Sequence, residues 1–88
     1  MKKIQTSLNA MEEKVYKCIC IEKVSVKDSR DTDVILYKDV RYNVRKGYGN
    51  DVVVEGRFGG FYKNGEEYSI METRFINKDI CKKYLRYV

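Results

Sequence analysis

The sequence contains no histidine, no proline and no tryptophan. Because histidine is the only side chain whose unperturbed pKa lies near neutrality, the usual general acid or base is missing, and so is the commonest metal-binding nitrogen. Ser–His and Cys–His nucleophile pairs therefore cannot form. The carboxylates of Glu55 and Glu72 are interpreted as ion-pair partners of neighbouring basic residues rather than as an acid/base couple. These features predict a protein that is not an enzyme.

Cysteine is scarce, with only Cys18, Cys20 and Cys81 in the chain. A structural zinc site takes four ligands, and the chain offers neither a histidine nor a second cysteine pair to complete one. Two cysteines that stand two positions apart on one strand face also have poor geometry for a mutual disulfide. We expect three buried, reduced thiols and no bound metal. The GRFGG segment lacks the helix and the Lys-Ser/Thr of a phosphate loop, so no cofactor is predicted.

Long apolar runs are absent, and no apolar stretch follows the two lysines near the start. A membrane-spanning helix needs about 18 consecutive apolar residues, and a secretory signal needs an apolar core. We therefore expect no membrane span and a cytoplasmic location. A chain of 88 residues has room for one domain, residues 1–88. The net charge of +5 favours polyanions or acidic protein surfaces as partners.

Residues 52–75 carry the clearest structural pattern, a hairpin centred on Asn64-Gly65. An Asn-Gly pair between β-prone residues predicts a two-residue loop with a type I′ turn. Three charged pairs follow from that register: Lys63 with Glu66, Arg57 with Glu72, and Glu55 with Arg74. The opposite face is apolar and is predicted to be buried, with Val52, Val54, Phe58, Met71 and Phe75. A bulge at Gly59-Gly60 would instead exchange the faces before it.

The segments before the hairpin alternate between strand and turn patterns. Residues 7–13 are compatible with a short helix or with a flexible end, and residues 14–27 predict one long strand. The polar residues 28–33 predict an exposed loop. The following strand, which Asp39 can interrupt, places three apolar side chains inward and three polar ones outward: Val40, Tyr42 and Val44 against Arg41, Asn43 and Arg45.

The segments that flank the hairpin are a turn and a helix. Residues 46–51 predict a glycine-containing turn with Tyr48 exposed at its tip. After Phe75 the spacing becomes helical, with Asn77 as the N-cap, and Ile80, Tyr84 and Val88 share one face. We predict a mainly β fold: a small, SH3-like, partly open barrel of about five strands closed by a short C-terminal helical turn. A five-stranded oligonucleotide-binding barrel is the alternative.

Four segments in this order, VYKCI, RYNV, GGFY and INKDICKKYL, resemble small SH3-like proteins of phages and mobile elements of low-GC Gram-positive bacteria. The resemblance covers about residues 15–85 and rests on structural positions. The chain departs from the pattern at Lys38-Asp39, which replaces a glycine-containing turn, and at the longer polar insert over 28–33. The resemblance implies an SH3-like fold and, as for some phage proteins of this size, binding and disabling of host machinery. The proline-peptide groove of eukaryotic SH3 domains is not expected, because its tryptophan and proline are missing.

Four aromatic residues fall at loop and hairpin tips rather than at predicted core positions: Tyr48, Phe61, Tyr62 and Tyr68. Three arginines lie near them in the sequence: Arg41, Arg45 and Arg57. Tyrosine and arginine anchor both protein interfaces and stacked single-stranded bases. We therefore predict a partner-binding surface made of these seven residues, with a host protein as the partner and nucleic acid as the alternative. The plainer interpretation is a solvated basic strand with a tyrosine-bearing turn.

Overall fold

A computed structural model describes residues 14–88, so residues 7–13, for which the sequence left a short helix or a flexible end open, lie outside the described residues. The described part contains seven strands and one helix, in the order β1 (Val15–Cys20), β2 (Val24–Lys27), β3 (Asp33–Leu36), β4 (Arg41–Lys46), β5 (Asp51–Phe61), β6 (Glu67–Asn77), α2 (Lys78–Tyr84) and β7 (Leu85–Tyr87). None of the helices in this range is long and apolar enough to cross a membrane.

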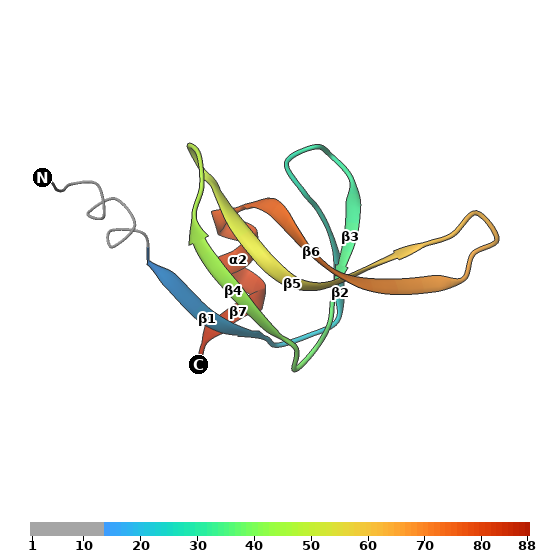
Figure 1. The fold of residues 1–88 in the computed structure, drawn as a ribbon, viewed down its shortest axis with the longest axis horizontal. Helices are drawn as coiled ribbons and strands as arrows, with labels where there is room; N and C mark the ends of the chain where they lie inside the picture. The colour runs from blue at the N-terminus through green and yellow to red at the C-terminus, as the bar shows by residue number, and fades with distance from the viewer. Residues whose placement is uncertain (1–13) are drawn as a thin grey trace, which may run out of the picture.

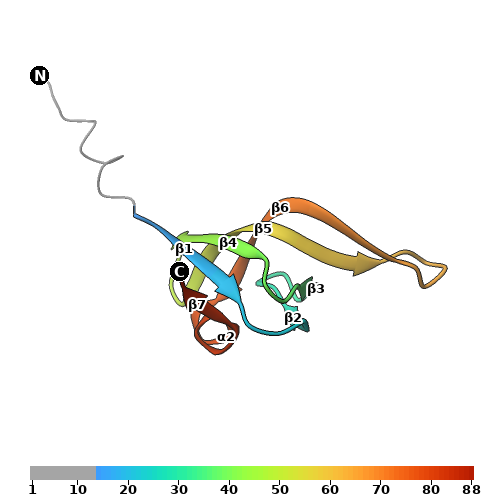
Figure 2. The same cartoon turned by 90° about the horizontal axis from the view of Figure 1, so that it is seen from below.

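The sheet is organised around β5. One edge of this strand pairs with β6 along its whole length, while the other edge is shared between β4, at residues 52–55, and β3, at residues 58–59. The path through the sheet is β2-β3-β5-β4-β1-β7, with β6 on the far side of β5. Figures 1 and 2 show the sheet curling over α2 while the tip of the β5–β6 ribbon projects away from the body.

This arrangement is mainly β and forms a small, partly open barrel of SH3-like type with one short C-terminal helix, as the sequence predicted. The number of strands is higher than the predicted five. One reason is that the expected long strand over 14–27 is two strands, β1 and β2, separated at residues 21–23. The other is that β7 follows α2 and pairs with β1.

The core lies inside the curled sheet and contains side chains from each strand and from α2: Cys18, Cys20, Val26, Val34, Leu36, Tyr42, Val54, Phe58, Ile76, Cys81 and Leu85. The rings of Tyr42 and Phe58 pack at 5.4 Å between centroids. The Tyr42 hydroxyl donates to the carbonyl oxygen of Arg57 and accepts from the amide of Tyr37. The buried phenol is therefore satisfied on both sides, and it joins β4 to β5 and to the residue that follows β3.

The hairpin forms where the sequence predicted it, but its register is shifted by one residue. The amide of Tyr62 donates to the carbonyl oxygen of Glu66 and the amide of Gly65 donates to that of Tyr62, which leaves residues 63–65 as a three-residue loop. Gly65 has a φ of 90°, while Asn64 does not enter the positive-φ region. This is a turn followed by a glycine bulge, so the predicted type I′ turn is wrong.

The shifted register changes which residues of β6 face the core, because side chains alternate along a strand. Arg57 lies opposite Met71 rather than Glu72, and Glu55 lies opposite Thr73 rather than Arg74. Phe58 is fully buried as predicted, and so is Val54, and Val52 packs against the core. The predicted burial of Met71 and Phe75 is wrong, because both side chains are exposed. Ile76 occupies the core instead.

Gly59 and Gly60 do not form a bulge, since the ladder between β5 and β6 continues through both of them. They are needed for another reason. A Cβ atom on Gly59 would clash with the ring and hydroxyl of Tyr37, and a Cβ on Gly60 would meet the ring of Tyr68 at 2.8 Å. The absence of side chains lets two tyrosine rings lie directly on the backbone of β5.

Both the predicted break at Asp39 and the predicted loop over residues 28–33 are present before β4. Asp39 has a φ of 67° and separates β3 from β4, as the sequence suggested. Tyr42 of β4 is buried and Arg41 is exposed, which confirms the predicted alternation. The loop after β2 was predicted to be exposed throughout, but Asp28 is buried because it accepts hydrogen bonds from the amides of Arg30 and Thr32 and pairs with Arg74.

The C-terminal helix begins as predicted, with Oδ1 of Asn77 accepting a hydrogen bond of 2.8 Å from the amide of Asp79. It ends at Tyr84, where the chain becomes extended and enters β7. Val88 therefore does not share a helical face with Ile80 and Tyr84, and its side chain is exposed. The spacing of the sequence predicted a helix that extends to Val88, which is longer than the observed one. The last residues form β7 instead, because they pair with β1, which is remote in the sequence.

Candidate functional site

The projecting part of the β5–β6 ribbon, residues 60–71, is here called the arm (Figure 1). Five large apolar side chains on it are exposed: Phe61, Tyr62, Tyr68, Ile70 and Met71. Ladder pairing places Phe61 and Met71 on one face and Tyr68 and Ile70 on the other. A two-stranded ribbon with both faces exposed has little stability of its own, and clustered exposed apolar groups are typical of interaction sites.

Tyr62 and Tyr68 give one face of the arm an aromatic platform. Their ring centroids lie 4.8 Å apart with an interplanar angle of 40°. Tyr68 lies opposite Gly60, and its ring covers that glycine. The pair is therefore held in place by the backbone of β5, so a partner that packs against it would order few new side-chain torsions.

Glu67, which lies opposite Phe61 in the last ladder pair before the hairpin loop, fixes the arm to the barrel. Its carboxylate accepts a hydrogen bond of 2.6 Å from the Tyr37 hydroxyl and forms an ion pair of 3.1 Å with the ammonium of Lys23. Lys23 also lies over the Tyr37 ring, at 5.5 Å from its centroid. Burial and the adjacent Glu67 raise the pKa of Tyr37 to about 12. The Tyr37 hydroxyl and Lys23 lower the pKa of Glu67, so this contact is present at neutral pH.

Arg57 lies where the arm meets the barrel. Its guanidinium donates a hydrogen bond of 3.2 Å from Nη1 to the hydroxyl of Ser69 on β6. Arg57, Ser69 and Tyr37 contribute to a shallow depression of about 360 Å³ at this junction, which Val40, Glu67 and Tyr68 complete. The depression combines a cation, a carboxylate and hydroxyl groups beside the aromatic platform, so it can accept a polar group of a partner.

The structure divides the predicted site into two regions. Arg57, Phe61, Tyr62 and Tyr68 lie on the arm or at its base, so four of the seven predicted residues are brought together. Tyr48 is 82% exposed, as predicted, but it lies in the loop before β5 and its ring stacks on Phe75 at 6.4 Å. The ten residue steps of β5 separate the two ends by about 33 Å.

The two remaining predicted residues lie on β4 rather than on the arm. Arg41 pairs across the sheet with Ile19, and Arg45 pairs with Val15 on one side and Val53 on the other. They occupy the same face of β4, since they are four positions apart, but Arg45 is at the end of the strand close to Tyr48. The surface of β4 that carries Arg41 and Arg45 is therefore separate from the aromatic arm.

Ile70 and Met71 were missed as site residues. Ile70 lies opposite Phe58 and Met71 lies opposite Arg57, at the point where the arm leaves the barrel. The prediction of a two-residue turn placed Met71 in the core. The observed register differs by one residue and places its side chain on the surface. No local signal in the sequence could have revealed this, because Glu72 and Arg74 share one face of the strand in either register.

All three cysteines are buried and unpaired, as expected from the sequence. Burial raises the pKa of the Cys18 and Cys20 thiols, and burial together with the neighbouring Cys18 raises that of Cys81 to about 12. Such thiols are poor nucleophiles at neutral pH. Within residues 14–88 no group of three or more histidine, cysteine, aspartate or glutamate side chains is arranged to hold a metal ion.

No protein-family model matches the chain, and neither a curated protein nor a solved structure matches it significantly. The function is therefore inferred from the geometry of the arm and of the barrel surface.

Proposed function

We propose that the protein is a non-enzymatic binding module that engages another protein through the arm. The observation that supports this is the exposure of five large apolar side chains on a ribbon that is tied to the barrel through Glu67. Aromatic anchors that are already held in place give affinity at a low entropic cost. The contact made by Tyr37 and Lys23 with Glu67 would keep the arm in one orientation relative to the barrel.

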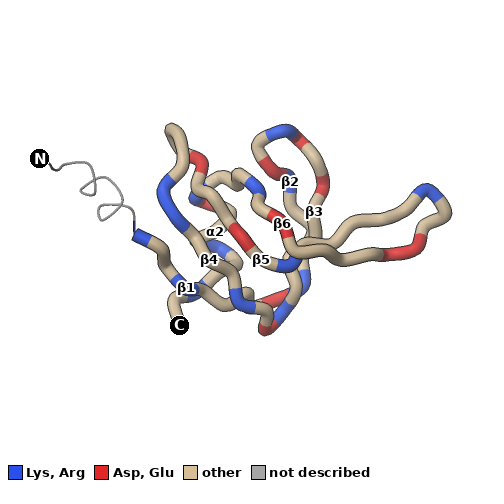
Figure 3. The backbone as a smooth tube through the Cα atoms, viewed as in Figure 1, with Lys and Arg blue, Asp and Glu red and all other residues tan. Residues whose placement is uncertain are grey.

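The charge on the arm favours a protein over a nucleic acid. Its ladder and loop carry Lys63 against Glu66 and Glu67, so the tip has no excess of positive charge (Figure 3). Nucleic-acid binding depends on neutralising phosphates, and single-stranded binders combine aromatic platforms with a basic groove. In this protein the arginines of β4 lie apart from the aromatic residues of the arm. Nucleic acid remains the second candidate because of the overall charge of +5.

The resemblance to small phage proteins suggests that the partner is a host protein, whose activity the module would inhibit or redirect. Nothing in this proposal requires catalysis. The apolar arm would insert into a groove of the partner, and the polar depression beside Arg57 would bind a group at the edge of that groove. An interface of this kind has an apolar centre and a polar rim.

A pull-down from host lysate with tagged protein tests this proposal. The arm variant Phe61→Ser/Tyr62→Ser removes two exposed rings, so it is expected to fold normally and to lose the captured protein. The control is Tyr48→Ser, which removes a still more exposed ring from the other end of β5 and is expected to retain the captured protein. Circular dichroism of both variants checks that the fold is unchanged.

Nuclease treatment and salt distinguish the two candidate partners. We expect capture to survive nuclease and to weaken only modestly with salt, because tyrosine and phenylalanine anchors carry no charge. Capture that disappears with nuclease, together with steep salt dependence on a bare oligonucleotide, would favour the nucleic-acid alternative. Equal capture by the arm variant and the wild type would contradict the role of the arm.

A further inference from the structure

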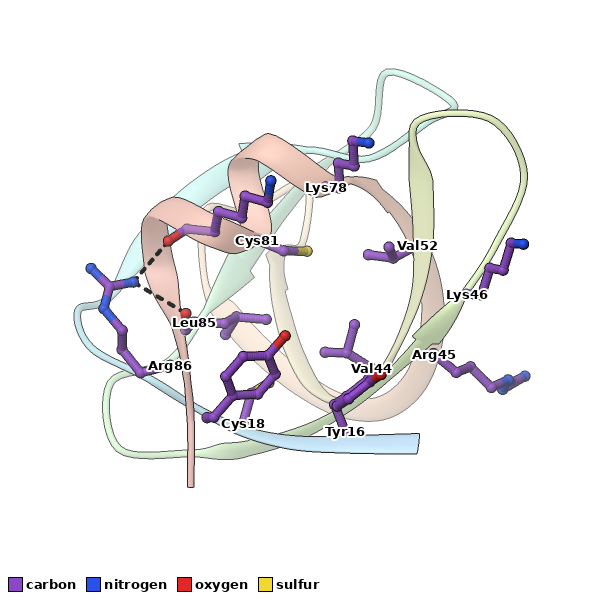
Figure 4. Close-up of a pocket in the computed structure, with 12 residues that line it drawn as sticks. Tyr16, Cys18, Val44, Arg45, Lys46, Val52, Lys78, Cys81, Leu85 and Arg86 are labelled. Atoms are coloured by element: carbon purple, nitrogen blue, oxygen red, sulfur yellow. Dashed lines mark hydrogen bonds between the residues drawn. The ribbon is translucent and has the colours of Figure 1, made fainter. Parts of the chain in front are cut away.

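A second recess lies at the end of the barrel that faces away from the arm, between β1, β4, α2 and β7 (Figure 4). Its volume is about 510 Å³, which lies within the range of about 300–1,000 Å³ typical of small-molecule sites. Its interior is formed by apolar side chains and two thiols: Cys18, Val44, Val52, Cys81 and Leu85. The rings of Tyr16 and Tyr87, 5.5 Å apart, border the same recess.

The rim of this recess is basic. Its charged members are all cations: Arg45, Lys46, Lys78, Lys82 and Arg86. Arg86 is already engaged, because its Nη1 donates hydrogen bonds to the carbonyl oxygens of Lys82, Lys83 and Leu85 at the end of α2. Figure 4 shows Lys78 at the top of the view and Lys46 at its right. Within residues 14–88 no carboxylate lines the recess.

Three of these cations, Lys46, Lys78 and Lys82, form no ion pair with any carboxylate of residues 14–88. Lys78 and Lys82 are four positions apart on α2, where like charges face each other and repel. Among the lysines of residues 14–88 only Lys23 and Lys27 have acidic partners, so the rim is distinguished by the clustering of its cations around one recess. An anion placed at this rim would relieve the repulsion and supply the missing partner.

The interior limits what such an anion can carry. A sugar or a nucleobase brings several hydrogen-bonding groups, and apolar walls would leave those groups unsatisfied at a substantial cost. A hydrocarbon chain has no such groups and gains free energy on leaving water. We propose that the recess binds a small amphipathic anion, with its hydrocarbon chain against Val44, Val52 and Leu85 and its anionic head among Lys46, Lys78 and Lys82. This site is independent of the arm.

Titration of the full chain with monomeric decanoate, followed by amide NMR shifts, tests the proposal. We expect saturable shifts confined to residues around the recess, and similar behaviour with decyl phosphate, whose head has the same sign of charge. Decyltrimethylammonium has the same chain with a cationic head, and it is expected to bind at least about tenfold more weakly because the rim repels it. Equal affinities for decanoate and decyltrimethylammonium, or no saturable shift with decanoate, would overturn the proposal.

Matched variants separate the site from general adsorption. Lys78→Gln/Lys82→Gln is expected to weaken decanoate binding about fivefold, as loss of two partly exposed ion pairs would. Lys38→Gln/Lys63→Gln removes the same charge from exposed positions elsewhere and is expected to leave binding unchanged. Val52→Phe fills the recess and is expected to abolish binding. Equal weakening by both lysine pairs, or shifts centred on the arm, would show non-specific adsorption and contradict the site.

Discussion

Arg74 on β6 donates a hydrogen bond of 2.9 Å from Nη1 to Oδ2 of Asp28, joining residues that are 46 positions apart in the sequence. The same guanidinium contacts Glu72 through Nη2, also at 2.9 Å. Asp28 is buried and its other oxygen accepts the amides of Arg30 and Thr32. One arginine thus ties the loop after β2 to the inner face of β6, and this link depends on the observed register.

Arg74→Met is expected to lower the free energy of unfolding by about 2 kcal/mol, because it leaves the buried carboxylate of Asp28 without a cation. The measurement is urea denaturation followed by circular dichroism. The control is Asp33→Asn, which removes the partner of Lys27 from an ion pair whose side chains are both more than half exposed. That change is expected to cost less than about 0.5 kcal/mol. Similar losses in both variants would contradict the importance of the Arg74–Asp28 pair.

The same carboxylate predicts a loss of stability in acid. Burial by itself would raise the pKa of Asp28, but hydrogen bonds from the Thr32 amide, Arg74 and the Arg30 amide outweigh it, so the pKa is lowered. A lowered folded-state pKa stabilises the protein above the unfolded-state value of about 3.9, and this stability is lost as the pH falls through the folded-state pKa. Urea midpoints measured from neutral pH downward should therefore decline more steeply in the wild type than in Asp28→Asn. Parallel profiles would contradict this.

Gly59→Ala tests the close approach of Tyr37 to β5. A methyl group at this position would clash with the Tyr37 ring, so we expect a loss of about 2 kcal/mol, which is typical of overpacking. In a Tyr37→Ala background the obstacle is absent, and the same glycine change is expected to cost markedly less. Thermal or urea unfolding of the four proteins gives this coupling directly. Additive losses would show that Gly59 is required for a different reason.

The three cysteines are expected to remain reduced and free of metal in solution. Their burial, and the raised pKa of each thiol, predict slow alkylation of the native protein and rapid alkylation after unfolding. Intact mass under native conditions checks the first point, and timed labelling with iodoacetamide checks the second. A bound zinc ion, or a mass decrease from a disulfide, would contradict the expectation. Cys81 is the most informative position because its pKa is raised to about 12.

Local signals in the sequence determined most of the elements. The alternation around Tyr42, the break at Asp39, the cap formed by Asn77 and the hairpin near Asn64-Gly65 were all read from a few neighbouring residues, and each is present. Burial of Phe58 and of the cysteines also followed from pattern and composition. These features depend on backbone preferences and on hydrophobicity, both of which act within short stretches of chain.

Tertiary structure decided the register, the surface and the cavity. An Asn-Gly pair fits either a two-residue or a three-residue loop, and the two differ by one residue in register. The register set by the three-residue loop buries Ile76, brings Arg74 to Asp28 and exposes Met71 on the arm. The Arg74–Asp28 contact involves the loop after β2, which is remote from the turn in the sequence. The recess between β1, β4, α2 and β7 likewise exists only once distant segments meet. Contacts of this kind cannot be predicted from the local spacing of residues, because each partner's position depends on the whole fold.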